Sequence, residues 1–266
     1  MPEGDAVRIT ANRLKLALAG RRLTVAELRW PGLSTARLAG TTILDVATVA
    51  KHLLLRLDNQ WTLHTHLRMD GRFVVRSVND PGPRGRSDPR RSPDARLVLA
   101  TADHWAVGLR LGMLDLVRTT DEFRLVGHLG PDLLAAEIDL EAAAARLAVP
   151  APIAQVLLDQ TAVSGIGTFW AAESLFVHRL DPWRAGDQID AAIRLRLLGW
   201  TRRLMLASVA QGLQASTGSR RPGETSYVHA RAGRPCRRCG TRIEVGVAGP
   251  PTRERPLFFC PQCQGR

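Results

Sequence analysis

Hydrophobic positions near the start of the chain recur every three or four residues, the spacing of one helix face. The positions that make up this face are Val7, Ala11, Leu14 and Leu18. Gly20 closes the run, Asp5 suits a helix cap, and Pro2 suits an early helical position. The pattern predicts a helix over residues 5–18.

Residues 21–120 instead contain short apolar or β-branched runs separated by turn signals, which is typical of strands. These runs cover residues 21–30, 41–49, 52–57, 61–67 and 72–77. Residues 79–94 interrupt the pattern with four Pro, two Gly and four Arg and no large apolar residue. We expect a solvated surface loop there; a loop that lies against a phosphate backbone is the alternative.

From about Gly130 the hydrophobic pattern becomes helical in period and composition. Helices are predicted over residues 132–149, 152–160, 168–176 and 187–211. A segment rich in Gly and Arg (215–235) then leads to four cysteines. We therefore expect an α+β multidomain protein. Its domains would be a β-rich domain with one N-terminal helix (1–129), a helical domain (130–219) and a small metal finger (220–266).

The four cysteines carry the most specific motif in the chain. They follow the pattern C-x2-C-x20-C-x2-C at Cys236, Cys239, Cys260 and Cys263. Four thiolates suit tetrahedral Zn²⁺, and the two segments between the pairs resemble the strands of a hairpin. We expect one structural Zn²⁺; a redox dithiol is the alternative. Residues 220–255 carry nine Arg and three Glu, so the finger could follow a phosphate backbone, although such a finger can also bind protein.

The charge of the whole chain points to a polyanionic partner. The 266 residues carry a formal net charge of +12, and nucleic acid is the simplest partner for such a chain. Almost all of the positive charge comes from Arg, because Lys15 and Lys51 are the only lysines. A GC-rich genome is the alternative explanation for this excess of Arg. No apolar run is long enough to span a membrane and no signal-peptide pattern is present, so we expect a cytoplasmic protein.

The start Met1-Pro2-Glu3 has a chemical reading. If Met1 is removed, Pro2 becomes a secondary amine, and an α-amino group titrates near pH 8. Attack of this amine on a sugar C1′ gives an iminium ion, an electron sink for elimination, and Glu3 could serve as acid or base. The alternative is an ordinary processed N-terminus.

The turn Ser164-Gly165-Ile166-Gly167 lies between two predicted helices. Its glycines would let backbone N–H groups approach a ligand, and the next helix would offer its positive N-terminus to an anion. A phosphate suits this position; a plain helix–helix turn is the alternative.

Four further positions could have a functional role. Lys51 precedes a predicted strand and could be a phosphate clamp, a proton relay or a solvated lysine at a strand edge. His64 and His66 share a strand face, and a metal pair there would lack a third ligand. Met69 follows at a turn, as core filler or as a wedge inserted between bases.

Six motifs in order resemble one family over the whole chain. They are MPEGD, Lys51, HLRMDG, LGPDLL, LLDQ…SGIG…AES and PCRRCG…CPQCQ. Together they are similar to the formamidopyrimidine-DNA glycosylase and endonuclease VIII family of bifunctional DNA repair enzymes. The resemblance implies a β-sandwich, a helix–two-turns–helix domain and a zinc-finger hairpin.

The resemblance also implies roles. Damaged bases are flipped out of DNA, Pro2 attacks C1′ and forms a Schiff base, and β,δ-elimination nicks the strand. Glu3, Lys51 and Glu173 match the family's other catalytic positions. The positions that match DNA contacts are His66, Met69, Gly165, Gly167, Thr168 and Arg255.

The chain departs from the family pattern at several positions. Thr168 stands where the family has Asn, Trp170 where it has Tyr, and Arg68 where a glutamine is common. Residues 109–112 read Leu-Arg-Leu-Gly, without the Arg-Arg-Phe of the oxoguanine branch. This favours the endonuclease VIII side, with oxidised pyrimidines and abasic sites as substrates.

Our first hypothesis is therefore a monomeric glycosylase and abasic-site lyase that acts on damaged or abasic DNA, duplex or partly single-stranded, at a bacterial nucleoid. One rival is a family member that binds such DNA without base excision, because of Thr168 and Arg68. The other is a zinc-ribbon transcription or RNA factor, which would not need Pro2, Glu3 and Lys51 together.

Overall fold

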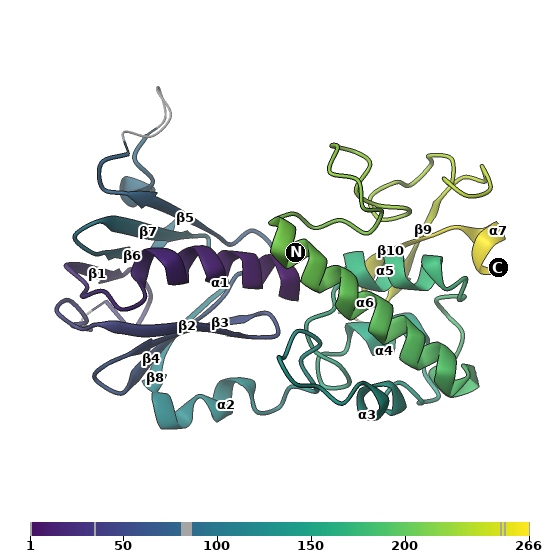
Figure 1. The fold of residues 1–266 in the computed structure, drawn as a ribbon, viewed down its shortest axis with the longest axis horizontal. Coiled ribbons are helices and arrows are strands. Elements are labelled where there is room, and N and C mark those ends of the chain that lie inside the picture. The colour runs from purple at the N-terminus through teal and green to yellow at the C-terminus, as the bar shows by residue number, and fades with distance from the viewer. Residues whose placement is uncertain (1, 35, 81–86, 251, 253, 266) are drawn as a thin grey trace. The chain divides into compact units, whose positions relative to one another are not determined.

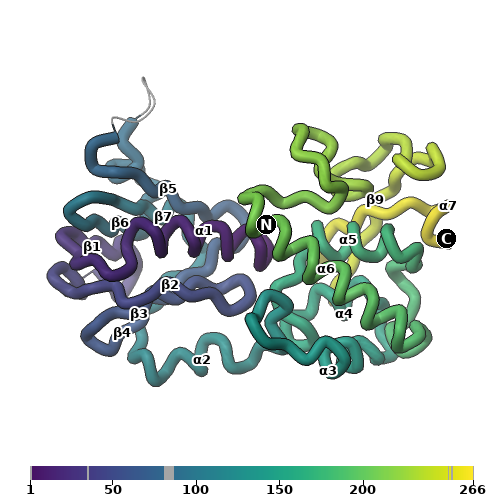
Figure 2. The backbone as a smooth tube through the Cα atoms, viewed as in Figure 1, coloured from purple at the N-terminus to yellow at the C-terminus, as the bar shows by residue number. Residues whose placement is uncertain are grey.

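The computed structural model describes residues 2–34, 36–80, 87–250, 252 and 254–265. Contacts divide the chain into two compact units. Unit 1 comprises residues 1–2 and 7–128, and unit 2 comprises residues 3–6 and 129–266 (Figures 1 and 2). The division into three domains with boundaries after residues 129 and 219 stays a prediction.

Unit 1 is a sandwich of two four-stranded antiparallel sheets, with strand orders β1-β6-β7-β5 and β2-β3-β4-β8 (Figure 1). The predicted strands 52–57 and 72–77 agree with the structure residue for residue. The strands are β1 (Val25–Leu28), β2 (Ile43–Val49), β3 (His52–Leu57), β4 (Trp61–His66), β5 (Arg72–Ser77), β6 (Ala95–Ala100), β7 (His104–Leu109) and β8 (Met113–Arg118).

The N-terminal helix α1 (Gly4–Leu18) supplies one side of the sandwich core. Its predicted apolar face is confirmed, since Val7, Ala11, Leu14 and Leu18 are all at most 2% exposed. The sheets contribute inward-facing leucines such as Leu55 and Leu97 to the same core. The helix begins one residue earlier than predicted, so Pro2 precedes it and Asp5 lies inside its first turn.

The predicted loop at 79–94 is only partly described, because residues 81–86 lie outside the described residues. Its later part holds a short 3-10 helix, η1 (Pro89–Arg91), capped by the Asp88 side chain. Two further short helices, η2 (Thr119–Asp121) and α2 (Phe123–Val126), end unit 1.

Unit 2 is built around helices, as predicted. Within the stretch 132–149 only α3 (Leu140–Ala145) is an α-helix. The Asp139 side chain caps its N-terminus by accepting from the Ala142 N–H. Trp170 and Phe176, both on α5, are fully buried in the core. The helical elements are α3 (Leu140–Ala145), α4 (Ile153–Leu158), α5 (Thr168–Val177), η3 (Gly186–Gln188) and α6 (Ala191–Gln211).

The predicted hairpin near the C-terminus is present as β9 (Glu244–Ala248) paired antiparallel with β10 (Arg255–Phe259). A short helix, α7 (Pro261–Gln264), follows. Leu257 and Cys260 join the hydrophobic core of the helices, and the Gln264 amide donates to the Leu180 carbonyl at 2.9 Å. The hairpin therefore belongs to the core of unit 2.

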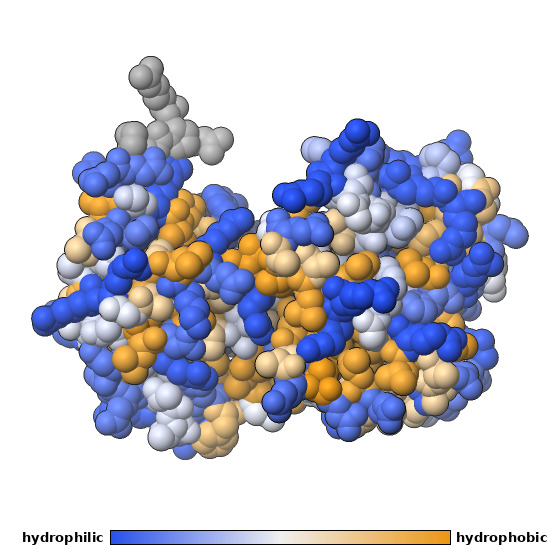
Figure 3. All heavy atoms as spheres, in the orientation of Figure 1, coloured by the Kyte–Doolittle hydropathy of each residue, from blue (hydrophilic) through white to orange (hydrophobic). Residues whose placement is uncertain are grey.

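The surface agrees with a highly charged chain. On the face that Figure 3 shows, blue hydrophilic residues surround smaller orange apolar areas on both units. Within the described part of the chain, no helix has the length and apolar character needed to cross a membrane.

Candidate active site

The residues before and at the start of α1 are anchored on the turn at 164–167. The Gly4 N–H donates to the Gly165 carbonyl at 2.9 Å. The Glu3 carboxylate is 1% exposed and accepts hydrogen bonds from the start of α5. Its donors are the backbone N–H groups of Gly167 (2.8 Å), Phe169 (2.6 Å) and Trp170 (3.2 Å). Pro2, which directly precedes Glu3, is half-buried.

The structure explains why both residues of this turn, Gly165 and Gly167, are glycines. A Cβ at Gly167 would lie 2.5 Å from Cδ of Glu3, so only glycine leaves room for the carboxylate. Gly165 has φ of +98°, a left-handed conformation that favours glycine. Its N–H donates to Oε1 of Gln160 at 3.1 Å.

The anion at the N-terminus of α5 is therefore the Glu3 carboxylate and not the phosphate that the sequence suggested. The Gly165 and Gly167 amides donate to protein acceptors in this structure, and a DNA contact at these two residues stays a prediction. Thr168, the first residue of α5, differs from them. Among the described residues, neither its hydroxyl nor its backbone N–H has a hydrogen-bond partner.

A second buried carboxyl lies beside Glu3. Asp5 is 0% exposed, and Nε2 of Gln214 donates to its two oxygens at 2.9 and 3.2 Å. Burial, and then repulsion from Glu3, raise the pKa of Asp5 to about 7. The sequence pattern indicated only a helix cap at Asp5 and gave no sign of this buried carboxyl.

Glu173 occupies the middle of α5 and is fully buried. Burial raises the pKa of this carboxyl, and its hydrogen bonds oppose the rise. The donors are the Ser216 hydroxyl and the backbone N–H groups of Tyr227 (2.7 Å), Val228 (2.8 Å) and His229 (2.8 Å). The carboxylate is thus engaged within unit 2, which favours a positioning role for Glu173 over the predicted catalytic one.

Lys51 lies in the turn between β2 and β3, directly after Ala50, whose φ of +52° is unusual for a residue with a side chain. It is only 5% exposed, which excludes the alternative of a solvated strand-edge lysine. His66 ends β4 and is half-buried. The metal-pair alternative for His64 and His66 is also excluded, because both ring nitrogens of His64 bond to protein neighbours.

Met69 and Arg255 are predicted to contact DNA, which requires their side chains to be accessible. Met69 is at a turn and 62% exposed, which excludes the core-filler alternative. Arg68 beside it has φ of +53° and lies over Gly112, where a Cβ would be 2.2 Å from Cγ of Arg68. Arg255 is the first residue of β10 and is half-buried.

The four cysteines gather at the hairpin, with all their sulfur atoms within 4.8 Å of one another. The Sγ–Sγ distances are 3.9 Å for Cys236–Cys263 and 3.5 Å for Cys239–Cys260. These distances are too long for disulfides. A tetrahedral Zn²⁺ with Zn–S bonds near 2.3 Å requires roughly 3.8 Å between sulfurs. The four cysteines are therefore positioned to hold one metal ion, and the donor set suits zinc.

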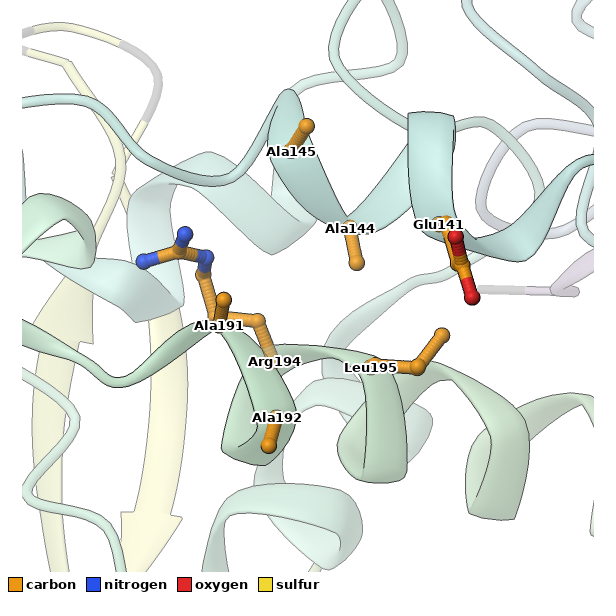
Figure 4. Close-up of a pocket in the computed structure, with 7 residues that line it drawn as sticks. All are labelled: Glu141, Ala144, Ala145, Ala191, Ala192, Arg194 and Leu195. Carbon is orange, nitrogen blue, oxygen red and sulfur yellow. The ribbon is translucent and has the colours of Figure 1, made fainter.

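A pocket of about 240 Å³ lies between α3 and α6. Four alanines and Leu195 line it, with Glu141 and Arg194 at opposite ends (Figure 4). The Arg194 guanidinium donates to the Gly186 carbonyl at 3.1 Å. The lining holds neither a nucleophile nor a set of metal ligands, so we place no chemistry there.

Comparisons with known proteins identify the family of the chain. Residues 1–124 match the formamidopyrimidine-DNA glycosylase N-terminal domain, and residues 129–219 match the H2TH domain of the same family. The chain is 42% identical to "Probable endonuclease 8 2" of Streptomyces coelicolor, over 99% of this chain and 94% of that protein. It is 36% identical to "DNA-(apurinic or apyrimidinic site) lyase Nei2" of Mycolicibacterium smegmatis, over 99% of each.

A solved structure has the same fold. Lactococcus lactis formamidopyrimidine-DNA glycosylase, bound non-covalently to DNA with an abasic site, aligns with a TM-score of 0.81 and 22% identity. The alignment covers 99% of this chain and 100% of that one. With these matches, the chain belongs to the formamidopyrimidine-DNA glycosylase family, in its endonuclease VIII-like branch.

Proposed function

We propose that this protein is a bifunctional DNA glycosylase and abasic-site lyase of base excision repair. It removes oxidised bases, mainly pyrimidines, and nicks the strand at the resulting abasic site. The observation that carries the proposal is the anchoring of residues 3 and 4, in which the amides of Gly167 and of the first turn of α5 hold the carboxylate of Glu3, the residue after Pro2.

The chemistry begins at Pro2. Once Met1, which lies outside the described residues, has been removed, the Pro2 nitrogen attacks C1′ and loses its proton, and the base leaves with the electrons of its glycosidic bond. The C1′–O4′ bond then breaks and the sugar ring opens. The resulting iminium ion has no N–H to lose, so it draws electrons from C2′. Loss of a C2′ proton expels the 3′ phosphate, and a second elimination expels the 5′ phosphate.

Glu3 and Lys51 have separate roles in this proposal. Glu3 takes up the proton that the Pro2 nitrogen loses, delivers it to the ring oxygen as the sugar opens, and moves protons during elimination. The amides that hold the Glu3 carboxylate lie at the start of α5. The carboxylate is therefore already in position before the reaction begins. Lys51 binds a backbone phosphate as a point charge. Glu173 holds residues 227–229 against α5 and does not contact the reacting atoms.

DNA contacts complete the proposal. His66, Thr168 and Arg255 bind phosphates, and exposed Met69 fills the space that the flipped base leaves. When bound at the four cysteines, zinc stabilises the hairpin that carries Arg255. We further propose that the protein acts as a monomer on duplex or partly single-stranded DNA in the cytoplasm.

Thr168 favours a second candidate, a family member that acts on abasic sites without excising bases. A threonine hydroxyl is shorter than the asparagine amide that the family resemblance implies at this position. Two duplexes separate the candidates, one with a single abasic site and one with a single oxidised pyrimidine. The proposal predicts nicking of both, with phosphate on both ends of the gap. Nicking of the abasic duplex alone favours the second candidate, and nicking of neither by folded, zinc-containing protein contradicts both.

A further inference from the structure

A cluster of polar side chains occupies the outer face of the sheet β2-β3-β4-β8. In this sheet His52 lies opposite His66, and His64 lies opposite Asp115. Their neighbours along the strands, such as Leu53, point into the sandwich core. The three histidines and Asp115 therefore share the face that is turned away from that core.

Two hydrogen bonds link members of this cluster in a line. Nδ1 of His64 lies 2.9 Å from Oδ2 of Asp115, and Nε2 of His64 lies 2.8 Å from Nδ1 of His52. His64 is 0% exposed, whereas the Asp115 side chain is 40% exposed. The line thus runs from the solvent-exposed carboxylate through a buried ring to the residue that follows Lys51.

The carboxylate determines where the protons sit on both rings. Burial lowers the pKa of His64, although Asp115 opposes the change. Burial, followed by the charges of neighbouring histidines and Lys51, lowers the pKa of His52 to about 3. Both rings are therefore neutral near pH 7. A carboxylate only accepts, so His64 carries its proton on Nδ1 and accepts from His52 through Nε2. His52 then carries its proton on Nδ1 and a lone pair on Nε2.

The far end of the line is next to two candidate phosphate contacts. Lys51 precedes His52 in the chain, and its positive charge acts on the His52 ring. The rings of His52 and His66 meet edge to face, with centroids 4.8 Å apart and planes at 74°. The Arg68 N–H donates to Nδ1 of His66 at 2.9 Å, so neutral His66 carries its proton on Nε2 and is a donor there.

We propose that Asp115, His64 and His52 form a relay of positioning residues, which holds His52 in one neutral tautomer and thereby orients Lys51 and His66 toward the DNA backbone. This inference rests on the proposed function. The relay replaces apolar packing on a sheet face, and an unpaired ring there would leave a buried polar atom unsatisfied. With the relay intact, His52 keeps one tautomer without an N–H at Nε2, and His66 keeps a fixed edge-to-face ring partner.

Two substitutions at His64 separate a relay from simple packing. In His64→Gln the amide oxygen can take the place of Nε2 and accept from His52, whereas His64→Leu packs well but accepts nothing. Thr62→Val is the matched control, because Thr62 is buried on the same face of β4 and bonds to Glu122 at 2.6 Å, away from Lys51. Single-turnover nicking of an abasic duplex at saturating protein is the readout.

We expect His64→Leu to slow nicking by about tenfold, less than the roughly 10²–10⁴-fold that a directly acting acid or base contributes. His64→Gln should stay within about threefold of the wild type and Thr62→Val should match it. If packing alone mattered, the leucine variant would be at least as active as the glutamine variant, and that order overturns the proposal.

A second measurement does not depend on activity or on the variants. Nitrogen-15 chemical shifts of the histidine rings in the wild-type protein report the tautomers directly. Protons on Nδ1 of both His52 and His64 at pH 7 are the expected result. A proton on Nε2 of His52 overturns the relay whatever the nicking rates are. If the wild type fails to nick abasic DNA while the shifts are as expected, the proposed function fails and the relay tautomers stand.

Discussion

Replacement of Gly167 by alanine tests how the Glu3 carboxylate is held. The backbone at this position has φ of −129° and ψ of −159°, which an alanine adopts without strain. The added Cβ would nevertheless lie 2.5 to 2.7 Å from Cδ, Oε1 and Cγ of Glu3. The neighbouring α5 backbone cannot yield easily, because it is packed in the unit 2 core. Gly167→Ala should therefore displace the carboxylate from its three amide donors.

The size of the effect follows from these hydrogen bonds. A bond to a charged acceptor contributes roughly 1.5–3 kcal/mol, so three bonds set an upper bound of about 5–9 kcal/mol. The displaced side chain would regain part of this through other partners or water. We therefore expect the free energy of unfolding of unit 2 to fall by about 2–4 kcal/mol, toward the upper end for a single substitution. This corresponds to a fall in Tm of roughly 4–16 °C for a unit of this size.

Thermal unfolding of four proteins measures this coupling: the wild type, Gly167→Ala, Glu3→Ala and the double variant. Glu3→Ala removes the three atoms nearest to the new Cβ, so in that background Gly167→Ala should change the unfolding free energy by less than about 0.5 kcal/mol. Gly167→Ala should also nick abasic DNA more slowly, because the Glu3 carboxylate is displaced. A Gly167→Ala cost that persists unchanged in the Glu3→Ala background would refute the steric argument.

Three further predictions concern the interior of unit 2. Folding raises the pKa of Asp5 from 3.8 to about 7, so the folded protein binds the Asp5 proton more tightly than the unfolded chain does. Protonated Asp5 therefore contributes to stability below about pH 4, and this contribution is lost as the pH rises toward 7. Asp5→Asn should remove this slope from a plot of Tm against pH, and an unchanged slope would count against it. Glu173→Gln replaces the carboxylate that accepts from several backbone N–H groups with an amide. Hydrogen exchange at the amides of Tyr227 and Val228 should become at least about tenfold faster, which corresponds to a loss of about 1.4 kcal/mol or more of protection. Unchanged exchange would contradict the assigned contacts. Cys239→Ser should abolish stoichiometric zinc and weaken DNA binding while unit 1 stays folded, and a full zinc content would contradict the four-cysteine site.

Much of the fold could be predicted from local patterns. The apolar face of α1, the bounds of β3 and β5, and the C-terminal hairpin follow from periodicity and cysteine spacing. The helix expected over 132–149 was too long because the Asp139 side chain caps the N-terminus of α3, so the helix begins only at Leu140. A pattern of alanines and leucines does not reveal which polar residue between them will act as a cap.

The site was harder to predict because its contacts join distant parts of the chain. Glu3 bonds to amides more than 160 residues away, and Asp5 bonds to Gln214. No local pattern shows that an acidic residue near the N-terminus will fill the anion position at the start of a later helix. The line from His52 to Asp115 likewise depends on strand pairing, which sequence alternation constrains but does not specify.

The central claim is that the Pro2 amine forms the covalent bond to the sugar, and borohydride trapping tests it most directly. The substrate is a duplex with one abasic site, the control is Pro2→Gly, and intact mass first verifies that Met1 is absent. We expect a stable protein–DNA adduct with the wild type and a loss of that adduct with Pro2→Gly. No adduct with zinc-loaded wild-type protein, or an equal yield with Pro2→Gly, would contradict the assignment of Pro2 as the nucleophile.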